Sequence, residues 1–366
     1  MLDTALKILK TIEENGYKAY IVGGFVRDYV LGIQSNDIDI CTSATPKDIS
    51  QIFSNAYLSN NEYGSVTIIY GNIRFEITTF RKESNYSDNR RPDTFEFIDD
   101  IYEDLKRRDF LINTLCMDKD GNILDLLDGK NDINNKIIHT VGNSYVRFSE
   151  DAFRILRAVR FATFLNFELS DDIKKSILDT KHLLKRISYE RKREELDKIF
   201  TSGNISYGID LLCELELDRE LELGNLNRIT NYDDLMGIWA QISYPNNTYK
   251  FTSNEKDLIN RIKEVLILDN TDSNVLYEYG LYVNSVAAAI KGIDKKVIAD
   301  LYNKLPIKSN RDIKINGEDI SLCLNREPGK YIKEIINDIK NKILNNSLEN
   351  DKEVLIKYVE DNYSVI

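Results

Sequence analysis

Two aspartates, Asp37 and Asp39, have the residue type and spacing that most directly suggest chemistry in this chain of 366 residues. They alternate with Ile38 and Ile40, a pattern typical of a strand that buries one apolar face. Side chains two residues apart on a strand point to the same side, so we expect both carboxylates to face one point. Like charges held side by side repel unless a cation neutralises them, and carboxylate oxygens suit hard divalent ions. The sequence therefore predicts a catalytic pair that holds metal.

A double glycine lies upstream of the aspartates. Gly23 and Gly24 follow an apolar stretch and precede a short helical pattern that carries Arg27. Glycine lets the backbone approach a phosphate closely, and the first N–H groups of a helix attract anions. Arg27, one helical turn further on, adds a charge for phosphate oxygens. A Gly-Gly pair alone is usually only a turn, but next to metal-binding carboxylates it predicts nucleotidyl transfer.

Three more charged residues are candidates for the same site. Glu76 lies in the hydrophobic stretch 73–80 and is a candidate third metal ligand, with a solvent-facing strand residue as the equal alternative. Arg108 and Asp109 precede an apolar run, where a solvated edge is the ordinary interpretation. On their own these three residues do not distinguish the two interpretations.

Asp151 and Arg154 open a helical stretch that also carries Arg157 and Arg160. Residues three apart are neighbours on a helix, so an ordinary ion pair is one interpretation. The other concerns bases, because cytosine and adenine present an amino donor beside a ring acceptor, whereas uracil and guanine present a carbonyl beside a ring N–H. A carboxylate paired with a guanidinium would therefore accept C and A and reject U and G.

Regular elements must position these residues. Apolar residues recur at helical spacing over 2–14, and Thr45 followed by Pro46 is typical of a helix start. The stretches 66–70 and 73–80 predict a hairpin around residues 71–72. Further predictions are a mobile loop over 81–94, a buried element over 107–117, and a turn over 125–132 that leads to a helix.

Helical periodicity dominates from Arg147 onward, and strand signals there are few. A chain of this length is too long for one hydrophobic core, so two or more units are expected. The sequence therefore predicts a mixed α/β head to about residue 140, followed by helices.

The composition is that of an ordinary globular protein, with 42% hydrophobic and 30% charged residues. The first residues do not resemble a signal peptide, and no apolar run approaches membrane-spanning length. We therefore expect a cytoplasmic protein without membrane contact. Four dispersed cysteines without CxxC spacing fit reduced, buried thiols. Only two histidines are present, which excludes His-based zinc sites.

The net charge of −11 opposes indiscriminate binding to RNA, because contacts with the phosphate backbone need Lys and Arg. Local basic patches stay open as binding surfaces. The candidates are the stretches 174–193 and 291–314, the second with seven basic residues against three acidic ones, whereas 208–223 is strongly acidic. A charge run is more often a solvated face, so both interpretations remain.

Five motifs in order resemble the class II tRNA nucleotidyltransferases, which are the CCA-adding enzymes and the related bacterial poly(A) polymerases. They are GGFVRDYVLG…DIDI as the first motif, FRKESNYSDNRRPDTFEF as a flexible loop, RRDFLINTLC as the ribose motif, and DLLDG and RFSEDAFRILRAVRF as the next two. INGEDI and PGKYI resemble weaker family patterns. The strong part covers about residues 20–165. Leu111 and Thr114 depart from the Thr and Ala that the ribose motif commonly has.

The resemblance implies a seahorse-like fold with an α/β nucleotidyltransferase head over residues 1–140 and an all-helical remainder. That remainder comprises a neck over 141–200 that selects nucleotides, a body over 201–270, and a tail over 271–366 that binds tRNA. The implied reaction is the template-independent addition of C, C and A to the 3′ end of tRNA, from CTP and ATP, with release of pyrophosphate. It implies two Mg²⁺ ions as cofactors and contact with the tRNA 3′ end and its acceptor and T arm.

The resemblance also carries over site residues. Asp37 and Asp39 match the family's metal-binding aspartates. Arg108 and Asp109 match the motif that senses the ribose 2′-OH, and Asp151 with Arg154 match the amino-acid template for the incoming base. The full nucleotide-binding set that it implies is Gly23, Gly24, Arg27, Arg108, Asp109, Asp151, Arg154, Arg157 and Arg160.

Four alternatives stay beside full CCA addition. A bacterial poly(A) polymerase shares the head motifs, although many carry extra basic termini that this acidic chain lacks. A CC-adding enzyme resembles the family with a shortened loop, which is disfavoured here, whereas an A-adding enzyme keeps the loop. An inactive RNA-binding relative has no need for Asp37 and Asp39. The sequence predicts no oligomeric state.

Overall fold

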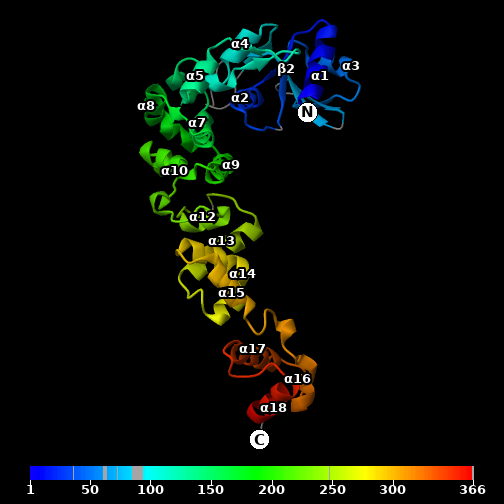
Figure 1. Ribbon diagram of the computed structural model, residues 1–366, viewed down its shortest axis with the longest axis vertical. Helices are drawn as coiled ribbons and strands as arrows, with labels where there is room; N and C mark the ends of the chain where they lie inside the picture. The colour runs from blue at the N-terminus through cyan, green and yellow to red at the C-terminus, as the bar shows by residue number, and fades with distance from the viewer. Residues whose placement is uncertain (36, 61–63, 72, 85–93, 247, 365–366) are drawn as a thin grey trace. The chain divides into compact units, whose positions relative to one another are not determined.

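The computed structural model of the chain describes residues 1–35, 37–60, 64–71, 73–84, 94–246 and 248–364 (Figure 1). The chain divides into two compact units, residues 1–227 with 246–249 and residues 228–245 with 250–366. The finer division into head, neck, body and tail stays a prediction.

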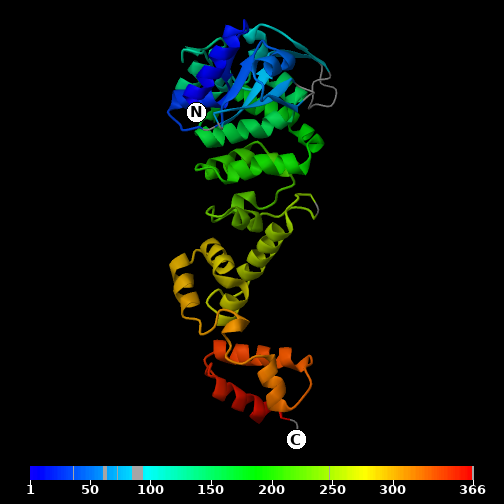
Figure 2. The ribbon, with the colours of Figure 1, turned by 90° about the vertical axis from the view of Figure 1, so that its right-hand side faces the viewer.

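A seven-stranded mixed sheet forms the scaffold of the first unit, with its strands in blue and cyan in Figure 2. The strand order is β3-β4-β5-β2-β1-β8-β9. β2 runs antiparallel to β1 and parallel to β5, so Asp39 lies opposite Val22 on one side and Glu76 on the other. The strand bounds are β1 Ala19–Val22, β2 Asp39–Thr42, β3 Tyr57–Asn60, β4 Ser65–Tyr70, β5 Ile73–Thr79, β8 Cys116–Met117 and β9 Ile123–Leu124.

Three helices precede or separate the first strands of this sheet: α1 Leu2–Glu14, α2 Gly24–Leu31 and α3 Pro46–Ile52. α1 has the predicted bounds, and its apolar stripe is buried. α3 begins at Pro46 as predicted, because Thr45 and Asp48 cap it reciprocally through their side chains and backbone N–H groups. Gly32, which has a φ of +69°, follows the last residue of α2 and caps the helix.

The predicted hairpin is confirmed, since β4 and β5 pair in antiparallel register from Ser65 and Thr78 to Tyr70 and Ile73. Its predicted turn residue 72 lies outside the described residues. The predicted loop over 81–94 is wrong at both ends, because β6 (Arg81–Ser84) and β7 (Thr94–Phe97) form an antiparallel pair. The polar sequence RKES lacks apolar alternation, so its pattern did not reveal a strand. The middle of that loop, residues 85–93, lies outside the described residues.

Short elements lead from β7 into a helical region within the same unit. The predicted buried element over 107–117 is confirmed, with Phe110, Ile112 and Leu115 fully buried. The parallel pair β10 (Ile137–Ile138) and β11 (Glu168–Leu169) interrupts this mostly helical part. The helices are α4 Ile101–Lys106, η1 Leu111–Asn113, α5 Gly129–Asn135, α6 Ser144–Glu150, α7 Phe153–Leu165, α8 Asp171–Thr180, η2 Lys181–Arg186, α9 Tyr189–Phe200, α10 Ile205–Glu214, α11 Leu217–Glu220 and η3 Leu226–Arg228.

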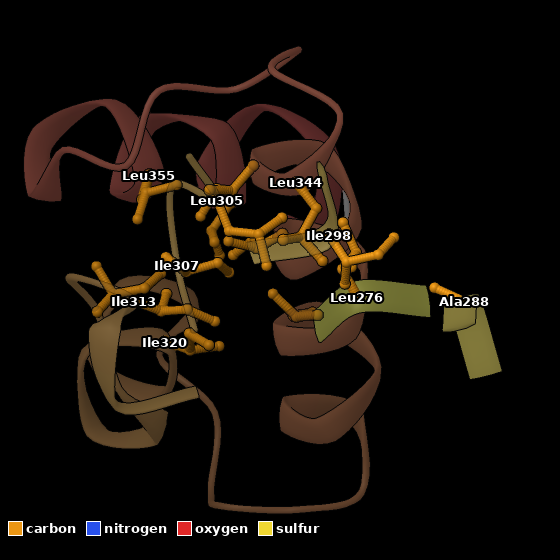
Figure 3. Close-up of a cluster of buried hydrophobic side chains, with 14 residues drawn as sticks. Leu276, Ala288, Ile298, Leu305, Ile307, Ile313, Ile320, Leu344 and Leu355 are labelled. Carbon is orange, nitrogen blue, oxygen red and sulfur yellow. The ribbon is translucent and has the colours of Figure 1, made fainter. Parts of the chain in front are cut away.

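Helices alone form the regular structure of the described residues in the second unit. Its core includes Leu276, Ile298, Leu305 and Leu344 (Figure 3). Gly280, with φ +74° and ψ 174°, breaks α14. The helices are α12 Leu235–Gln241, α13 Ser253–Leu266, α14 Ser273–Ile290, α15 Lys295–Asn303, η4 Asn310–Asp312, α16 Gly317–Leu324, α17 Tyr331–Leu344 and α18 Lys352–Tyr363.

The predicted fold class is confirmed in outline as a mixed α/β head followed by a largely helical region. All four cysteines are free, with Cys41 and Cys116 buried and Cys213 and Cys323 half-buried. Among the described residues, none of the helices combines the length and apolar character needed to cross a membrane.

Candidate active site

A pocket of about 380 Å³ opens beside the central strands of the sheet. It contains both signs of charge, because carboxylates of β2 and β5 face arginines that follow β5 and α4. Its lining comprises Val22, Asp39, Ile40, Cys41, Ser65, Glu76, Thr78, Arg81, Arg107 and Arg108. Of the predicted site residues, the structure thus brings Asp39, Glu76 and Arg108 into one pocket.

The aspartate pair lies at the start of β2. The strand begins at Asp39, so Asp37 precedes it rather than lying within it as predicted. The predicted alternation nevertheless holds, since both aspartates are exposed whereas Ile38 and Ile40 are buried. Partial burial of the carboxylate, followed by the negative charge of Asp37, raises the pKa of Asp39 to about 6. Such crowding of negative charge is what a bound cation relieves.

Glu76 lies directly beside Asp39 in the parallel register of β2 and β5, and its charge also raises the pKa of Asp39. Within the described part of the chain, however, no group of three or more Asp, Glu, His or Cys side chains is close enough to hold a metal ion. The described residues therefore supply only part of a metal ion's ligands. Their chemistry fits a divalent cation whose remaining ligands come from substrate oxygens or water.

Gly23 lies between the arginine and the aspartate of the pocket. It has a φ of +77° and a ψ of −142°, a backbone conformation that residues other than glycine rarely adopt. A Cβ at this position would lie 3.6 Å from Arg108 Nη1 and 3.7 Å from Asp39 Oδ2. A Cβ at Gly24 would lie 3.5 Å from Arg27 Nη2. Glycine at 23 therefore leaves open the space between the two charged side chains.

Arg27 is not where its predicted phosphate contact would place it. The side chain is only 4% exposed and does not line the pocket. Its Nε and Nη2 donate to Asp28 Oδ1 at 2.9 and 2.7 Å, and its Nη1 donates to Asn113 Oδ1 at 2.7 Å. Arg27 is thus a structural cation in this state.

The same network continues to the ribose motif and to α7. Asn113 Nδ2 donates to Asp109 Oδ1 at 3.1 Å, and Arg157 Nη2 lies 2.6 Å from Asp109 Oδ2. Although burial raises it, the pKa of Asp109 is lowered to about 2 by the Arg157 guanidinium and the Asn113 hydrogen bond. Two predicted nucleotide contacts therefore bind one another here, and Asn113 is a partner that the sequence did not reveal.

Arg107 and Arg108 share a buried carboxylate, Asp104, which is fully buried on α4. Burial raises the pKa of Asp104, but the two guanidinium groups outweigh it and lower that pKa below its ordinary value. The sequence interpretation missed Asp104. Its spacing of three and four residues from the arginines on a helix was the available signal.

Asp151 lies at a break between two helices, and Arg154 lies in the first turn of the second helix. α6 ends at Glu150 and α7 begins at Phe153, whose N–H donates to Asp151 Oδ1 at 3.0 Å. Burial raises the pKa of Asp151, and the charge of Arg154 partly offsets this. Arg154 Nη1 donates to Glu150 Oε2 at 2.9 Å, and its Nη2 donates to the Arg107 carbonyl at 3.3 Å. The break sets the carboxylate apart from the helix while Arg154 stays anchored.

Arg160 pairs with a carboxylate of α9 and lies over the ring of Phe161. Its Nε lies 2.5 Å from Glu195 Oε2 on α9, and its guanidinium lies 4.0 Å from the centroid of the Phe161 ring. It lines a second pocket with Phe164 and Lys198, not the one that contains Asp39. The guanidinium groups of Arg27 and Arg157 lie 5.0 and 5.3 Å from the centroid of the same ring, so Arg160 lies with these two predicted contacts but outside the pocket that contains Asp39.

The basic stretch 174–193 faces the acidic stretch 208–223. Lys174 pairs with Glu214 at 3.1 Å, and Lys185 lies 3.6 Å from Glu220. Between them Lys181 pairs with Glu216. In the second unit, Lys291 of the other predicted patch donates to the carbonyls of Val265 and Leu268 at 2.9 and 2.5 Å. Parts of both predicted RNA patches therefore already have partners within the protein.

Family models match most of the chain. The "Poly A polymerase head domain" matches residues 19–139, "Probable RNA and SrmB- binding site of polymerase A" matches residues 166–221, and "tRNA nucleotidyltransferase domain 2 putative" matches residues 242–359. The first covers the sheet and the second covers α8 to α11, whereas α6 and α7 lie between the two matches. The third covers most of the second unit.

Full-length relatives and solved structures agree with these matches. The CCA-adding enzyme of Ligilactobacillus salivarius is 36% identical across 96% of this chain and 95% of the relative, and that of Staphylococcus haemolyticus is 34% identical across 100% and 99%. The CCA-adding enzyme of Bacillus stearothermophilus, solved with CTP, has a TM-score of 0.86 and 29% identity across 98% of this chain and 97% of that one. The Thermotoga maritima enzyme, solved with tRNA, is 21% identical with a TM-score of 0.71 and supports the fold alone.

Proposed function

The chain belongs to the family of CCA-adding enzymes and is a CCA tRNA nucleotidyltransferase, and from this premise we propose how its residues divide the work. The enzyme adds C, C and A to the 3′ end of tRNA from CTP and ATP. In this reaction the tRNA 3′-OH attacks the α-phosphate of the nucleotide and pyrophosphate leaves. Phosphoryl transfer of this kind needs positioning and charge stabilisation rather than a protein nucleophile.

The observation that carries the assignment of the site is the single pocket in which Asp39 and Glu76 lie side by side, with Arg108 and Gly23 beside Asp39. Asp37 and Asp39 are the proposed metal-binding carboxylates, and Glu76 is their neighbour on β5. Gly23 leaves space for the triphosphate, and Arg108 offers a cation to the nucleotide and its ribose.

Heads of this family use divalent metals, and we propose two Mg²⁺ ions here. When bound, the ions activate the attacking hydroxyl and stabilise the leaving phosphates. The protein's own contribution is to keep Asp37 and Asp39 exposed at the start of β2, where the buried side chains of Ile38 and Ile40 fix the position of the backbone.

Base choice belongs to Asp151 and Arg154 in this proposal. The helix break leaves Asp151 half-buried, and its backbone contact holds the carboxylate in place. Asp151→Ala should relax the preference for C and A over U and G by about tenfold to a hundredfold, since one bidentate base contact is of that order. Incorporation of each of the four nucleotides by the variant measures this, and unchanged selectivity would contradict the template role.

One assay tests the proposed function as a whole. tRNA without its CCA end is incubated with Mg²⁺ and with CTP and ATP, singly and together, and the added 3′ nucleotides are sequenced. We expect two C residues with CTP alone and a complete CCA end with both. A second substrate, tRNA ending in CC, identifies an A-adding enzyme if A is added to it while tRNA without its CCA end stays unchanged. Addition of C alone, or a poly(A) product, would identify the other partial or related activities. A cytoplasmic location and a tRNA-binding tail over residues 271–366 complete the proposal.

A further inference from the structure

Asp104 has no role in the function described so far, yet it is a buried carboxylate that contacts Arg81, Arg107 and Arg108 near the pocket. It lies on α4, is fully buried and does not line the pocket. Its Oδ1 accepts hydrogen bonds from Arg107 Nε at 2.9 Å and from the Arg81 backbone N–H at 3.1 Å. Its Oδ2 lies 3.4 Å from Arg108 Nη2. Asp104 therefore cannot touch a nucleotide and can act only through these partners.

Arg108 lies between two carboxylates. Its Nη2 faces the buried Asp104, and its Nη1 lies near the space above Gly23 that Asp39 Oδ2 borders from the other side. Its Nε is buried and has no hydrogen-bond partner among the described residues. A guanidinium held at one end and unsatisfied at another is prepared to donate to a ligand oxygen in the pocket. Without Asp104, the nearest opposite charge for Arg108 would be that of Asp39.

The same carboxylate also fixes the start of β6. Arg81 begins that strand, and Glu83 within it accepts from Arg81 Nε at 2.7 Å and lies 3.5 Å from Arg107 Nη1. Among the described residues, the cluster therefore contains three arginines and two carboxylates. The arginines of this cluster line the pocket, whereas Asp104 and Glu83 do not, so the guanidinium groups border the place that an anionic triphosphate would occupy.

We propose that Asp104 is a positioning residue of the nucleotide site, which holds Arg108 away from Asp39 and toward the nucleotide while anchoring Arg107 and the first residue of β6. The inference rests on the proposed role of Arg108 in ribose recognition. It adds a residue that the nucleotide does not contact but on which its affinity depends.

The test compares two neighbouring carboxylates on α4. Asp104→Asn removes the charge and keeps the shape, whereas Glu103→Gln removes a half-buried charge that pairs with Lys106 at 2.6 Å. We expect Asp104→Asn to raise KM for CTP and ATP about tenfold or more and to lower the preference for CTP over dCTP, since charged hydrogen bonds are lost. Glu103→Gln should leave both quantities unchanged. Equal effects of the two variants, or wild-type values in Asp104→Asn, would overturn the proposal.

A double-mutant cycle separates positioning from general destabilisation. Arg108→Lys is combined with Asp104→Asn, and thermal unfolding of each variant is followed beside its kinetics. If Asp104 acts through Arg108, the double variant should be little worse in KM than Arg108→Lys alone. Fully additive losses overturn the proposal. If Asp104→Asn does not fold, Asp104→Glu replaces it in the cycle, and wild-type KM in that variant counts against positioning. Addition of CCA by the wild-type chain in the same assay checks the proposed function separately.

Discussion

At the scale of single residues, the exposed and the buried members of the site have different physical tasks. Asp37 and Asp39 are exposed and contribute little to the core, whereas Arg27 and Asp109 are buried and held by partners. Replacing an exposed carboxylate should therefore change chemistry alone. Replacing a buried one should also change the free energy of unfolding.

For the exposed pair, Asp37→Ala should abolish nucleotide incorporation and leave tRNA binding nearly intact. The reason is that the side chain is exposed and its loss should not disturb the fold, while the cation loses a ligand. Incorporation and tRNA binding measured on the same preparation decide this. A parallel loss of both would contradict the metal-binding role.

Among the buried residues of the site, Asp109 is the one whose charge can be tested by pH. Asp109→Asn should destabilise the protein by about 2 kcal/mol at pH 7. The folded pKa of Asp109 is about 2, below its ordinary value of 3.8, so the stabilisation is present above pH 4 and is lost as the pH falls toward 2. Urea unfolding of wild type and variant at pH 7 and at successively lower pH measures the difference. A difference that does not shrink below pH 4 would show that ionisation of Asp109 is not its source.

At the scale of elements, the turn from β1 to α2 sets the geometry of the site. Gly23 and Gly32 both have positive φ, at the two ends of α2. Gly32→Ala should cost about 1 kcal/mol of stability and nothing else, because its Cβ would meet no atom within 4 Å. Gly23→Ala should cost more stability and also raise KM for CTP, since its Cβ would enter the space between Arg108 and Asp39.

These two variants are matched controls for each other. Denaturant unfolding gives the strain at each position, and the KM of each variant gives the effect on the site. If both raise KM equally, the effect comes from α2 as a whole, and the proposed approach of the triphosphate to Gly23 is wrong.

Local patterns account for what the sequence could predict at this scale. α1, α3 and the β4–β5 hairpin follow from periodicity, capping and turn residues within a few positions of one another. The burial of Arg27 could not be predicted, because its partner Asn113 is 86 residues away. The start of β2 at Asp39 was also missed, although the faces of Asp37 and Asp39 were predicted correctly.

At the scale of the whole molecule, the charges of this acidic protein are partly paired internally. The basic stretch 174–193 has partners on the acidic stretch 208–223, and Lys291 is held by backbone carbonyls. Counting lysines along the sequence therefore overstates the positive charge that is ready to meet RNA. Which lysines are held by the protein itself is a property of the fold.

Two lysines of the second unit make this measurable. Lys291→Gln should lower stability and leave tRNA affinity unchanged, because its ammonium group serves Val265, Leu268 and Asn270. Lys296→Gln, at an exposed position on α15, should reduce the salt dependence of tRNA binding by about one counterion if the stretch 291–314 meets phosphates. Affinity measured at several salt concentrations gives this slope, and an unchanged slope in Lys296→Gln would remove that stretch as a binding surface.

The chain of hydrogen bonds from Arg27 through Asn113 and Asp109 to Arg157 also constrains how this protein can change over generations. Each member is the partner that keeps the next one satisfied away from bulk water, and an orphaned buried group is costly. A substitution of any one of the four residues should therefore lower the stability of the protein until a second substitution compensates it. Substitutions at these positions are expected to arrive in pairs, across segments of the gene that lie far apart.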